Sequence, residues 1–160
     1  MDPQLRLLLE LTYEAILDAG MNPSELRGRR VGVYMGVSSS ESEEAWTADP
    51  ANVSGYALTG CCRAMFPNRI SYTFDFKGPS FAIDTACSSS MVALQTAWSA
   101  VSEGEVEAAI VGGTNLTLKP QNSMQFHALN MLASDGKCKS FDATGNGSVL
   151  VALMIVTRGI

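Results

Sequence analysis

The amino-acid sequence predicts an α/β fold, in which helices alternate with the strands of a mainly parallel or mixed central sheet. Short apolar runs at 31–37, 81–84 and 108–112 carry this prediction, and a fourth run follows at 149–156. Segments of helical composition or spacing separate them. The runs show little polar alternation, which is typical of strands covered on both faces. The 160 residues suit one domain with a substantial core.

The first predicted helix has clear signals at both ends. Asp2 is a suitable N-cap and Pro3 occupies the first helical position. Apolar residues then recur at helical spacing as far as Ile16, and Gly20 follows as a C-cap. The polar, acidic segment from Ser38 to Trp46 is predicted to be a solvated loop, with substrate contact as the alternative.

Later helices are predicted from composition and from chain breakers. Asp49-Pro50 opens a helical region, and Pro67 limits any helix that follows. Residues 91–101 are rich in Ala, Leu, Val and Gln, and residues 121–131 form the next helical segment. The pair Gly112-Gly113 fits neither a phosphate loop nor a dinucleotide fingerprint, so close backbone packing or a tight turn is expected there.

Composition limits the partners and the location of the chain. A formal net charge of -5 argues against nucleic acid or an acidic membrane as a partner. No apolar run approaches the ~20 residues of a membrane span, and the polar start lacks the pattern of a secretory signal. The chain is 46% hydrophobic and only 17% charged, which indicates much surface buried in a core or in a subunit interface.

The cysteines and the histidine favour a reducing cytoplasm and no metal. The four cysteines show neither Cys-x-x-Cys spacing nor a disulfide framework. The adjacent Cys61 and Cys62 are expected to be small packing residues, because neighbouring cysteines rarely bridge. A single histidine, His127, argues against a Cys/His metal site.

Cys87 is predicted to lie where a strand turns into a helix, within the segment 84–90 (Asp-Thr-Ala-Cys-Ser-Ser-Ser). Free amide hydrogens at a helix N-terminus favour a thiolate over a thiol and can hold a developing oxyanion. Such an elbow activates a nucleophile for acyl transfer. From this geometry alone, a buried structural cysteine is the slightly favoured alternative.

The same seven residues resemble the active-site signature of β-ketoacyl synthases, the condensing enzymes of fatty acid and polyketide synthesis. Other similar segments occur in the family's order, among them 2–10, 68–71 and 141–142. Residues 26–28 and 63–71 are most similar to the ketosynthase of animal-type multifunctional fatty acid synthase. Polyketide synthases are near relatives and stay open as an alternative.

The resemblance implies the N-terminal half of a thiolase-like fold, in which two similar α/β halves meet at the nucleophile. Residues 1–160 are then expected to form a partial synthase domain that lacks the family's first strand and helix and its C-terminal half. After the turn at 145–147, the sequence departs from the family, whose members continue with an aromatic residue, an arginine and a Glu-Gly pair before the next strand.

The resemblance also implies roles for individual residues. Cys87 takes an acyl chain as a thioester from the phosphopantetheine arm of an acyl carrier protein, and Phe126 lines the acyl-chain site, with ordinary core packing as an equal alternative. No metal and no cofactor of its own is expected, and the family works as a homodimer or in larger synthase assemblies. The motif residues expected to support the cysteine are Asp84, Thr85, Ala86 and Ser88.

Two catalytic histidines and a second oxyanion loop of the family have no match in the sequence. His127 is expected in solvent or in the core rather than in catalysis. The expected function is therefore β-ketoacyl-carrier-protein synthesis, a decarboxylative condensation through a cysteine acyl-enzyme, in a fragment unable to complete the reaction alone. The alternatives are a non-catalytic synthase-like protein that binds acyl groups or carrier protein, and a fragment of a polyketide ketosynthase.

Overall fold

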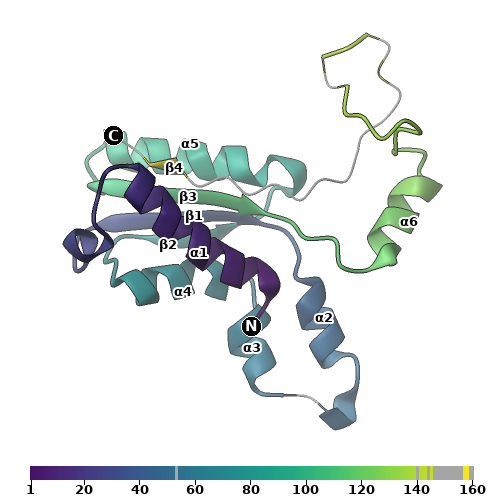
Figure 1. Ribbon diagram of the computed structural model, residues 1–160, viewed down its shortest axis with the longest axis horizontal. Helices are drawn as coiled ribbons and strands as arrows, with labels where there is room; N and C mark the ends of the chain where they lie inside the picture. Colours follow the sequence, from purple (N-terminus) through teal and green to yellow (C-terminus); the bar gives the residue numbers. More distant parts are fainter. Residues whose placement is uncertain (53, 140, 144, 146–156, 159–160) are drawn as a thin grey trace. The chain divides into compact units, whose positions relative to one another are not determined.

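The structure is a computed structural model, and it contains two compact units that are described separately (Figure 1). The first unit comprises Met1–Asn115 and Leu153–Ile160, and the second comprises Leu116–Ala152. The predicted strand at 149–156 lies outside the described residues. The residues that the structure describes are 1–52, 54–139, 141–143, 145 and 157–158.

A four-stranded mixed sheet forms the centre of the first unit, in the order β2-β1-β3-β4. β1 pairs in parallel with β2 and with β3, and β4 runs antiparallel to β3. This arrangement confirms the predicted mainly parallel or mixed sheet and its first three strands. The strands are β1 (Val31–Val37), β2 (Ser80–Ile83), β3 (Ala108–Thr114) and β4 (Thr157–Arg158).

Helices connect the strands and cover the sheet. The α-helices of the first unit are α1 (Pro3–Asp18), α2 (Glu41–Thr47), α3 (Tyr56–Cys61), α4 (Met65–Phe74) and α5 (Ser89–Ser102). Short 3₁₀ turns are η1 (Pro23–Leu26), η2 (Pro50–Asn52) and η3 (Ala86–Ser88). Figure 1 shows α1 and α4 on one face of the sheet and α5 on the other.

β1 is buried along its whole length because helices cover both of its faces. Val33 and Met35 point to the face where α1 and α4 pack, in a core cluster that includes Leu8 and Ile70. Tyr34 points to the opposite face, in a second cluster built largely from the alanines of α5. The alternating directions follow from the two-residue period of a strand. Continuous burial of β1 confirms the prediction of a strand covered on both faces.

α1 begins as the sequence predicts. The Asp2 side chain accepts a hydrogen bond from the Gln4 amide at 2.6 Å, and Pro3 lies in the first turn. Gly20 follows the helix with φ of 74°, a conformation that costs glycine little. The predicted apolar face, including Leu8 and Ile16, is buried.

The prediction of a solvated loop over 38–46 is wrong, because α2 occupies most of this segment. Ser40 caps the helix by accepting from the Glu43 amide at 3.1 Å, and three glutamates in the first turn complement the helix dipole. The Ser40 hydroxyl also donates to the buried Asp2 carboxylate, which fixes α2 beside α1. The Ser-x-x-Glu pattern at 40–43 is a capping-box signal that predicts this helix.

α4 extends across Pro67, which lies in its first helical turn. The proline nitrogen has no intrahelical partner to lose there, so the helix continues to Phe74. The second unit contains α6 (Pro120–Ala128), in the region of the helix predicted at 121–131. None of the helices in the described part of the chain is long and apolar enough to cross a membrane.

Candidate active site

The carboxyl ends of the parallel strands bring the candidate residues together. Ser38 follows β1, Asp84 follows β2, and Thr114 ends β3. These ends lie at one edge of the sheet, which is where open α/β sheets place their ligand sites. Between β2 and α5 the chain forms an elbow of five residues, 84–88, that contains Cys87. The predicted strand-to-helix position of Cys87 is confirmed.

The elbow backbone is strained immediately before Cys87. Ala86 has φ of 53°, in the left-handed region that residues with a side chain rarely adopt. This conformation costs an alanine roughly 1–2 kcal/mol. A sharp, strained turn between strand and helix is the arrangement that presents the nucleophile in α/β-hydrolases. Contacts from the surrounding structure must therefore hold Ala86 in place.

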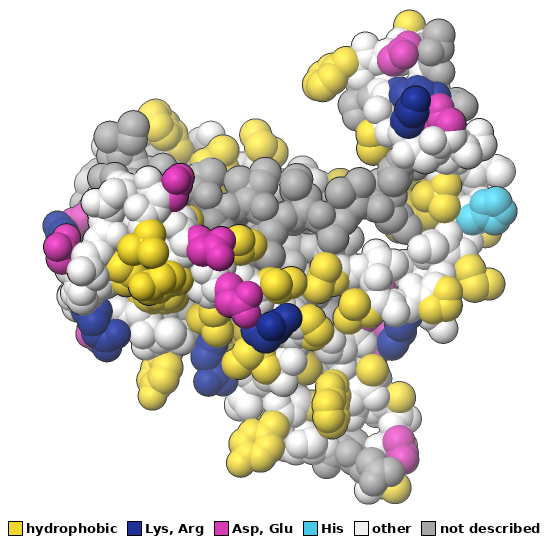
Figure 2. All heavy atoms as spheres, viewed as in Figure 1, with side chains coloured by type: hydrophobic (Ala, Val, Ile, Leu, Met, Phe, Trp, Pro, Cys, Tyr) yellow, Lys and Arg dark blue, Asp and Glu magenta, His cyan; other side chains and the backbone are white. Residues whose placement is uncertain are grey.

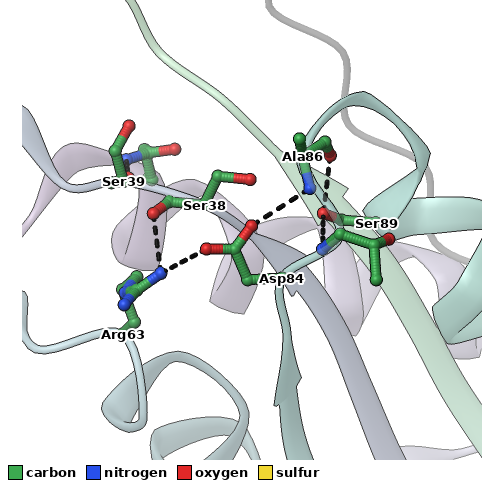
Figure 3. A network of polar contacts seen from close by, with 8 residues as sticks. Ser38, Ser39, Arg63, Asp84, Ala86 and Ser89 are labelled. Carbon is green, nitrogen blue, oxygen red and sulfur yellow. Dashed lines mark hydrogen bonds and ion pairs between the residues drawn. The ribbon is translucent and has the colours of Figure 1, made fainter.

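Asp84 supplies one set of these contacts, using its two carboxylate oxygens separately (Figure 3). Oδ1 accepts from the Ala86 amide at 3.1 Å, and Oδ2 accepts from Arg63 Nη1 at 2.6 Å. The same Arg63 nitrogen donates to the Ser38 carbonyl at 2.8 Å. The Ala86 amide above all, then the Ser38 side chain and Arg63, hold the pKa of the Asp84 carboxyl below its usual value.

Serines at the start of α5 tie the same turn from the other side. The Ser89 hydroxyl accepts from the Thr85 amide at 2.9 Å and donates to the Ala86 carbonyl at 2.6 Å. The Ser88 hydroxyl donates to the Thr85 carbonyl at 2.8 Å. Ser89 is buried, and Figure 3 shows it directly beneath the elbow beside Ala86. The serine-rich motif thus replaces water as the partner of the turn's backbone groups.

Two glycines let the start of α5 lie directly on the sheet. Gly36 of β1 and Gly113 of β3 are register partners. A Cβ on Gly36 would lie 2.7 Å from the Ser90 nitrogen, and a Cβ on Gly113 would lie 2.6 Å from the Ser90 Cβ. Any larger residue would push the helix away. The predicted close backbone packing at Gly113 is confirmed.

Cys87 itself is exposed, so the alternative of a buried structural cysteine does not hold. The four cysteines differ in accessibility: Cys61 is buried, Cys62 is partly buried, and Cys138 in the second unit is exposed. Burial, and then the negative charge of Asp2, raise the pKa of the Cys61 thiol. Cys61 is therefore the packing residue that the sequence predicts.

The second unit holds the other residues considered from the sequence. Phe126 lies on α6 and is partly buried, and its role as an acyl-chain contact stays a prediction. His127, the cyan side chain in Figure 2, is exposed. In the part of the chain that the structure describes, no three His, Cys, Asp or Glu residues are grouped so as to hold a metal ion.

Sequence reasoning missed Arg63, the Ser38 carbonyl and Ser89 as parts of this site. Arg63 lies 21 residues before Asp84, in the short link between α3 and α4, and no local pattern connects the two. Ser89 does stand within the quoted motif. A serine at the start of a helix that follows a turn is a usual partner for turn amides, and this signal could have identified it.

Comparison with known proteins decides the family. Residues 1–151 match the family model described as the β-ketoacyl synthase N-terminal domain. The chain belongs to the β-ketoacyl synthase family. These proteins are condensing enzymes of the acyltransferase type, so the resemblance seen in the sequence is confirmed.

Two curated relatives place the chain among synthases for fatty acids and polyketides. It is 57% identical to a fatty acid synthase of the goose Anser anser anser over 161 residues, covering 99% of the chain and 46% of that protein. It is 46% identical to a highly reducing polyketide synthase of Cryptosporiopsis over 147 residues, covering 92% of the chain and 6% of that protein. The chain thus spans about half the length of the first relative and a small part of the second.

Solved ketosynthases share the fold. The ketosynthase from module 6 of the bacillaene synthase of Bacillus subtilis matches 99% of the chain at 38% identity and a TM-score of 0.83. An oxazolomycin ketosynthase domain from Streptomyces albus matches 98% at 35% identity and a TM-score of 0.85. The chain covers 26% and 28% of those two proteins. These matches confirm the predicted thiolase-like α/β fold.

Proposed function

We propose that this chain carries the acyl-accepting part of a β-ketoacyl synthase of fatty acid biosynthesis, with Cys87 as the nucleophile. The observation that carries the proposal is an exposed cysteine directly after the strained Ala86 and two residues before the start of α5. The higher identity to a fatty acid synthase than to a polyketide synthase supports the choice of pathway.

The proposed step is transfer of an acyl group from the phosphopantetheine arm of an acyl carrier protein. The Cys87 thiolate attacks the thioester carbonyl, so a carbon–sulfur bond to the enzyme forms. The bond to the phosphopantetheine sulfur breaks, and that sulfur leaves as a thiolate that takes up a proton. Amide hydrogens at the start of α5 favour both the attacking thiolate and the oxyanion that forms in between.

Condensation with malonyl carrier protein is proposed to need groups from outside this chain. Loss of carbon dioxide and attack by the resulting carbanion require acid–base and electrostatic help, typically worth ~100-fold or more in rate per group. The single imidazole in the sequence, His127, is exposed on α6. The chain alone is therefore expected to stop at the acyl-enzyme.

Mass spectrometry of the purified chain tests both parts of the proposal. With an acyl thioester as donor, we expect one acyl group on the Cys87 peptide. Cys87→Ala should abolish it, and Cys138→Ala should leave it unchanged, since Cys138 is the other exposed cysteine. Equal acylation of both cysteines would overturn the role of Cys87. A β-ketoacyl product that depends on Cys87 would overturn the claim that the chain stops there.

Alkylation by iodoacetamide provides a second test that needs no acyl donor. Cys87 should react faster than Cys62 and Cys138, because it lies two residues before α5, a helix of 14 residues, and is exposed whereas Cys62 is partly buried. Cys61 should react slowest, because it is buried and its pKa is raised. Peptide-resolved time courses measure the order, and a slower rate at Cys87 than at Cys138 would contradict it.

Phe126 is proposed, on the family resemblance, to contact the acyl chain. Removing a ring from a chain-binding surface weakens apolar contact with longer acyl groups more than with short ones. Phe126→Ala should therefore lower acylation by a long-chain donor relative to an acetyl donor. An unchanged ratio would indicate that Phe126 has only a packing role.

A second copy of this chain is the proposed partner at β2. This strand lies at the edge of the sheet, and its residue Phe81 is 50% exposed although its ring also contacts the Tyr34 ring. An edge strand with unpaired backbone groups and apolar side chains is a site for association. Light scattering should give a dimer or larger species. Phe81→Lys should reduce its mass, whereas Tyr72→Lys, at an exposed aromatic residue of α4, should not.

A further inference from the structure

Asp84 links three segments that are far apart in the sequence. Its side chain joins the elbow at Ala86 to Arg63 in the link between α3 and α4. Arg63 in turn reaches the carbonyl of Ser38, directly after the buried end of β1. Figure 3 shows the resulting line of contacts from Ser38 through Arg63 and Asp84 to the Ala86 amide. The elbow is thereby anchored to the neighbouring strand.

Arg63 helps to orient the Asp84 carboxylate, to which the Ser38 side chain also contributes a hydrogen bond. One nitrogen, Nη1, makes both of its contacts, to Asp84 Oδ2 at 2.6 Å and to the Ser38 carbonyl at 2.8 Å. With Oδ2 held in this way, Oδ1 is directed at the Ala86 amide. Without Arg63, the Asp84 side chain could rotate into solvent, since it is partly exposed. Ala86 would then lose one of the two side-chain contacts that hold its left-handed conformation, and the Ser89 hydroxyl on its carbonyl would remain.

We propose that Arg63 is a positioning residue for Cys87 and acts through Asp84 and the Ala86 amide. The inference rests on the proposed function of Cys87 as the acyl-accepting nucleophile. Arg63 itself does not touch the reacting atoms in this scheme. It keeps the turn in the conformation that places the exposed Cys87 between the strained Ala86 and the start of α5.

The rival interpretation is that Arg63 and Asp84 form an ordinary surface ion pair. Their side chains are 47% and 43% exposed, and pairs of this kind add little to stability. The chain offers a matched control in Arg29 and Glu107, whose side chains are 52% and 47% exposed. This pair lies at the amino ends of β1 and β3, away from the elbow. An ordinary pair predicts the same outcome for both arginines.

The test compares Arg63→Ala with Arg29→Ala in the full chain. Acylation of Cys87 by an acyl thioester should fall about tenfold or more in Arg63→Ala, because transfer depends on the orientation of the thiol. Arg29→Ala should match the unchanged protein. Thermal unfolding midpoints of both variants should stay within about 4 °C of the starting protein. Equal acylation rates for the two variants would overturn the proposal.

Two further variants separate positioning from loss of structure. Arg63→Lys should restore most of the rate, because one nitrogen makes both native contacts and an ammonium group has three donors. Arg63→Ala combined with Asp84→Ala should be no slower than Asp84→Ala alone, because both act through one path. Fully additive losses, or no rescue by lysine, would contradict the proposed path.

Alkylation distinguishes failure of this inference from failure of the proposed function. If the starting protein forms no acyl-Cys87, the proposed function is wrong. The iodoacetamide rates then still test whether Arg63 positions Cys87 through Asp84. In that case Arg63→Ala should slow Cys87 relative to Cys138 by about threefold, as the thiol leaves the helix start. An unchanged ratio of the two rates would overturn the positioning role by itself.

Discussion

The amino and carboxyl ends of the parallel strands each carry an ion pair between an arginine and a carboxylate, but the backbone beside the two pairs differs. At the amino end, Arg29 Nε donates to Glu107 Oε2 at 2.8 Å, and at the carboxyl end Arg63 donates to Asp84. Each end also has a residue in the left-handed region. At the amino end, Gly28 beside the ion pair has φ of 75°, and Asp75 and Gly104, which precede β2 and β3, also adopt positive φ; at the carboxyl end the residue is Ala86.

The difference lies in what each carboxylate holds. Glycine adopts the left-handed region without strain, so the turn at Gly28 needs no help from the neighbouring ion pair. Alanine is strained there, and the second oxygen of Asp84 accepts from its amide. The same kind of surface ion pair is thus structurally minor at one end and shapes the backbone at the other. The same kind of substitution should therefore have different effects at the two ends.

The largest effect is expected where the carboxyl end meets α5. A Cβ at Gly36 would lie 2.7 Å from the Ser90 nitrogen and 2.8 Å from the carbonyl carbon of Ser89. Gly36→Ala should lower the free energy of unfolding by about 1–3 kcal/mol and displace the elbow. Urea unfolding and Cys87 acylation measure the two consequences.

The control for this substitution is Gly55→Ala. Gly55 has helical backbone angles, and an added Cβ would meet open space. Its free energy of unfolding should stay the same or rise by up to about 1 kcal/mol. If Gly36→Ala were as stable as this control, the contact between α5 and the sheet would not be tight.

The next largest effects are expected from substitutions at Gly28 and Ala86, two of the residues with positive φ. Gly28→Ala should lower the free energy of unfolding by about 1 kcal/mol or more, because it places a side chain at φ of 75°, and should leave acylation unchanged. Ala86→Gly should change the free energy of unfolding by less than about 1 kcal/mol, since relief of strain is offset by the greater freedom of glycine in the unfolded chain.

Combining Ala86→Gly with Arg63→Ala tests why the turn at Ala86 needs the contact with Asp84. In the Ala86→Gly background, Arg63→Ala should slow acylation less than it does in the unchanged protein. The measurement is the ratio of Cys87 acylation rates with and without Arg63→Ala, taken in both the unchanged and the Ala86→Gly background. An equal or larger loss in the glycine background would mean that Asp84 does not act by holding a strained alanine.

Removing one negative charge at each end gives a smaller contrast. Asp84→Asn keeps an oxygen that can accept from Ala86 but weakens the bond to Arg63, so acylation should fall by about threefold. Glu107→Gln should leave the rate within experimental error of the starting protein. Equal losses in the two variants would indicate a general effect of net charge rather than a local one.

The smallest effect concerns pH. The pKa of Asp84 is lowered from 3.8 in the folded chain, chiefly by the Ala86 amide. Its contribution to stability is therefore fully present above pH 3.8 and is lost as the pH falls through the lower folded pKa. Unfolding midpoints of the starting protein and Asp84→Asn should differ by a constant amount from pH 5 to 8 and converge below pH 3.8. A difference that changes around neutral pH would implicate another group.

Local patterns in the sequence were sufficient for most of the first unit. The cap at Asp2, the unbroken apolar runs of β1 and β3, and the place of Cys87 between strand and helix all depend on neighbours within a few residues. The wrong prediction over 38–46 also concerns a local signal: the acidic residues of this segment favour a solvated loop, whereas the capping box at Ser40 predicts the helix. The role of Phe126 stays a prediction, since it concerns a substrate.

The sequence by itself determined where the elbow lies and which residue it presents. Only the tertiary structure decided what holds the elbow in shape. The order β2-β1-β3 places the ends of distant segments side by side, so that Arg63 meets Asp84 and Gly36 lies opposite Gly113. Such pairs show no regular spacing in the sequence, because the lengths of the connections between strands set how many residues separate the two partners. The left-handed conformation of Ala86 also has no signal in the sequence, since an alanine adopts it only where the surrounding contacts hold it.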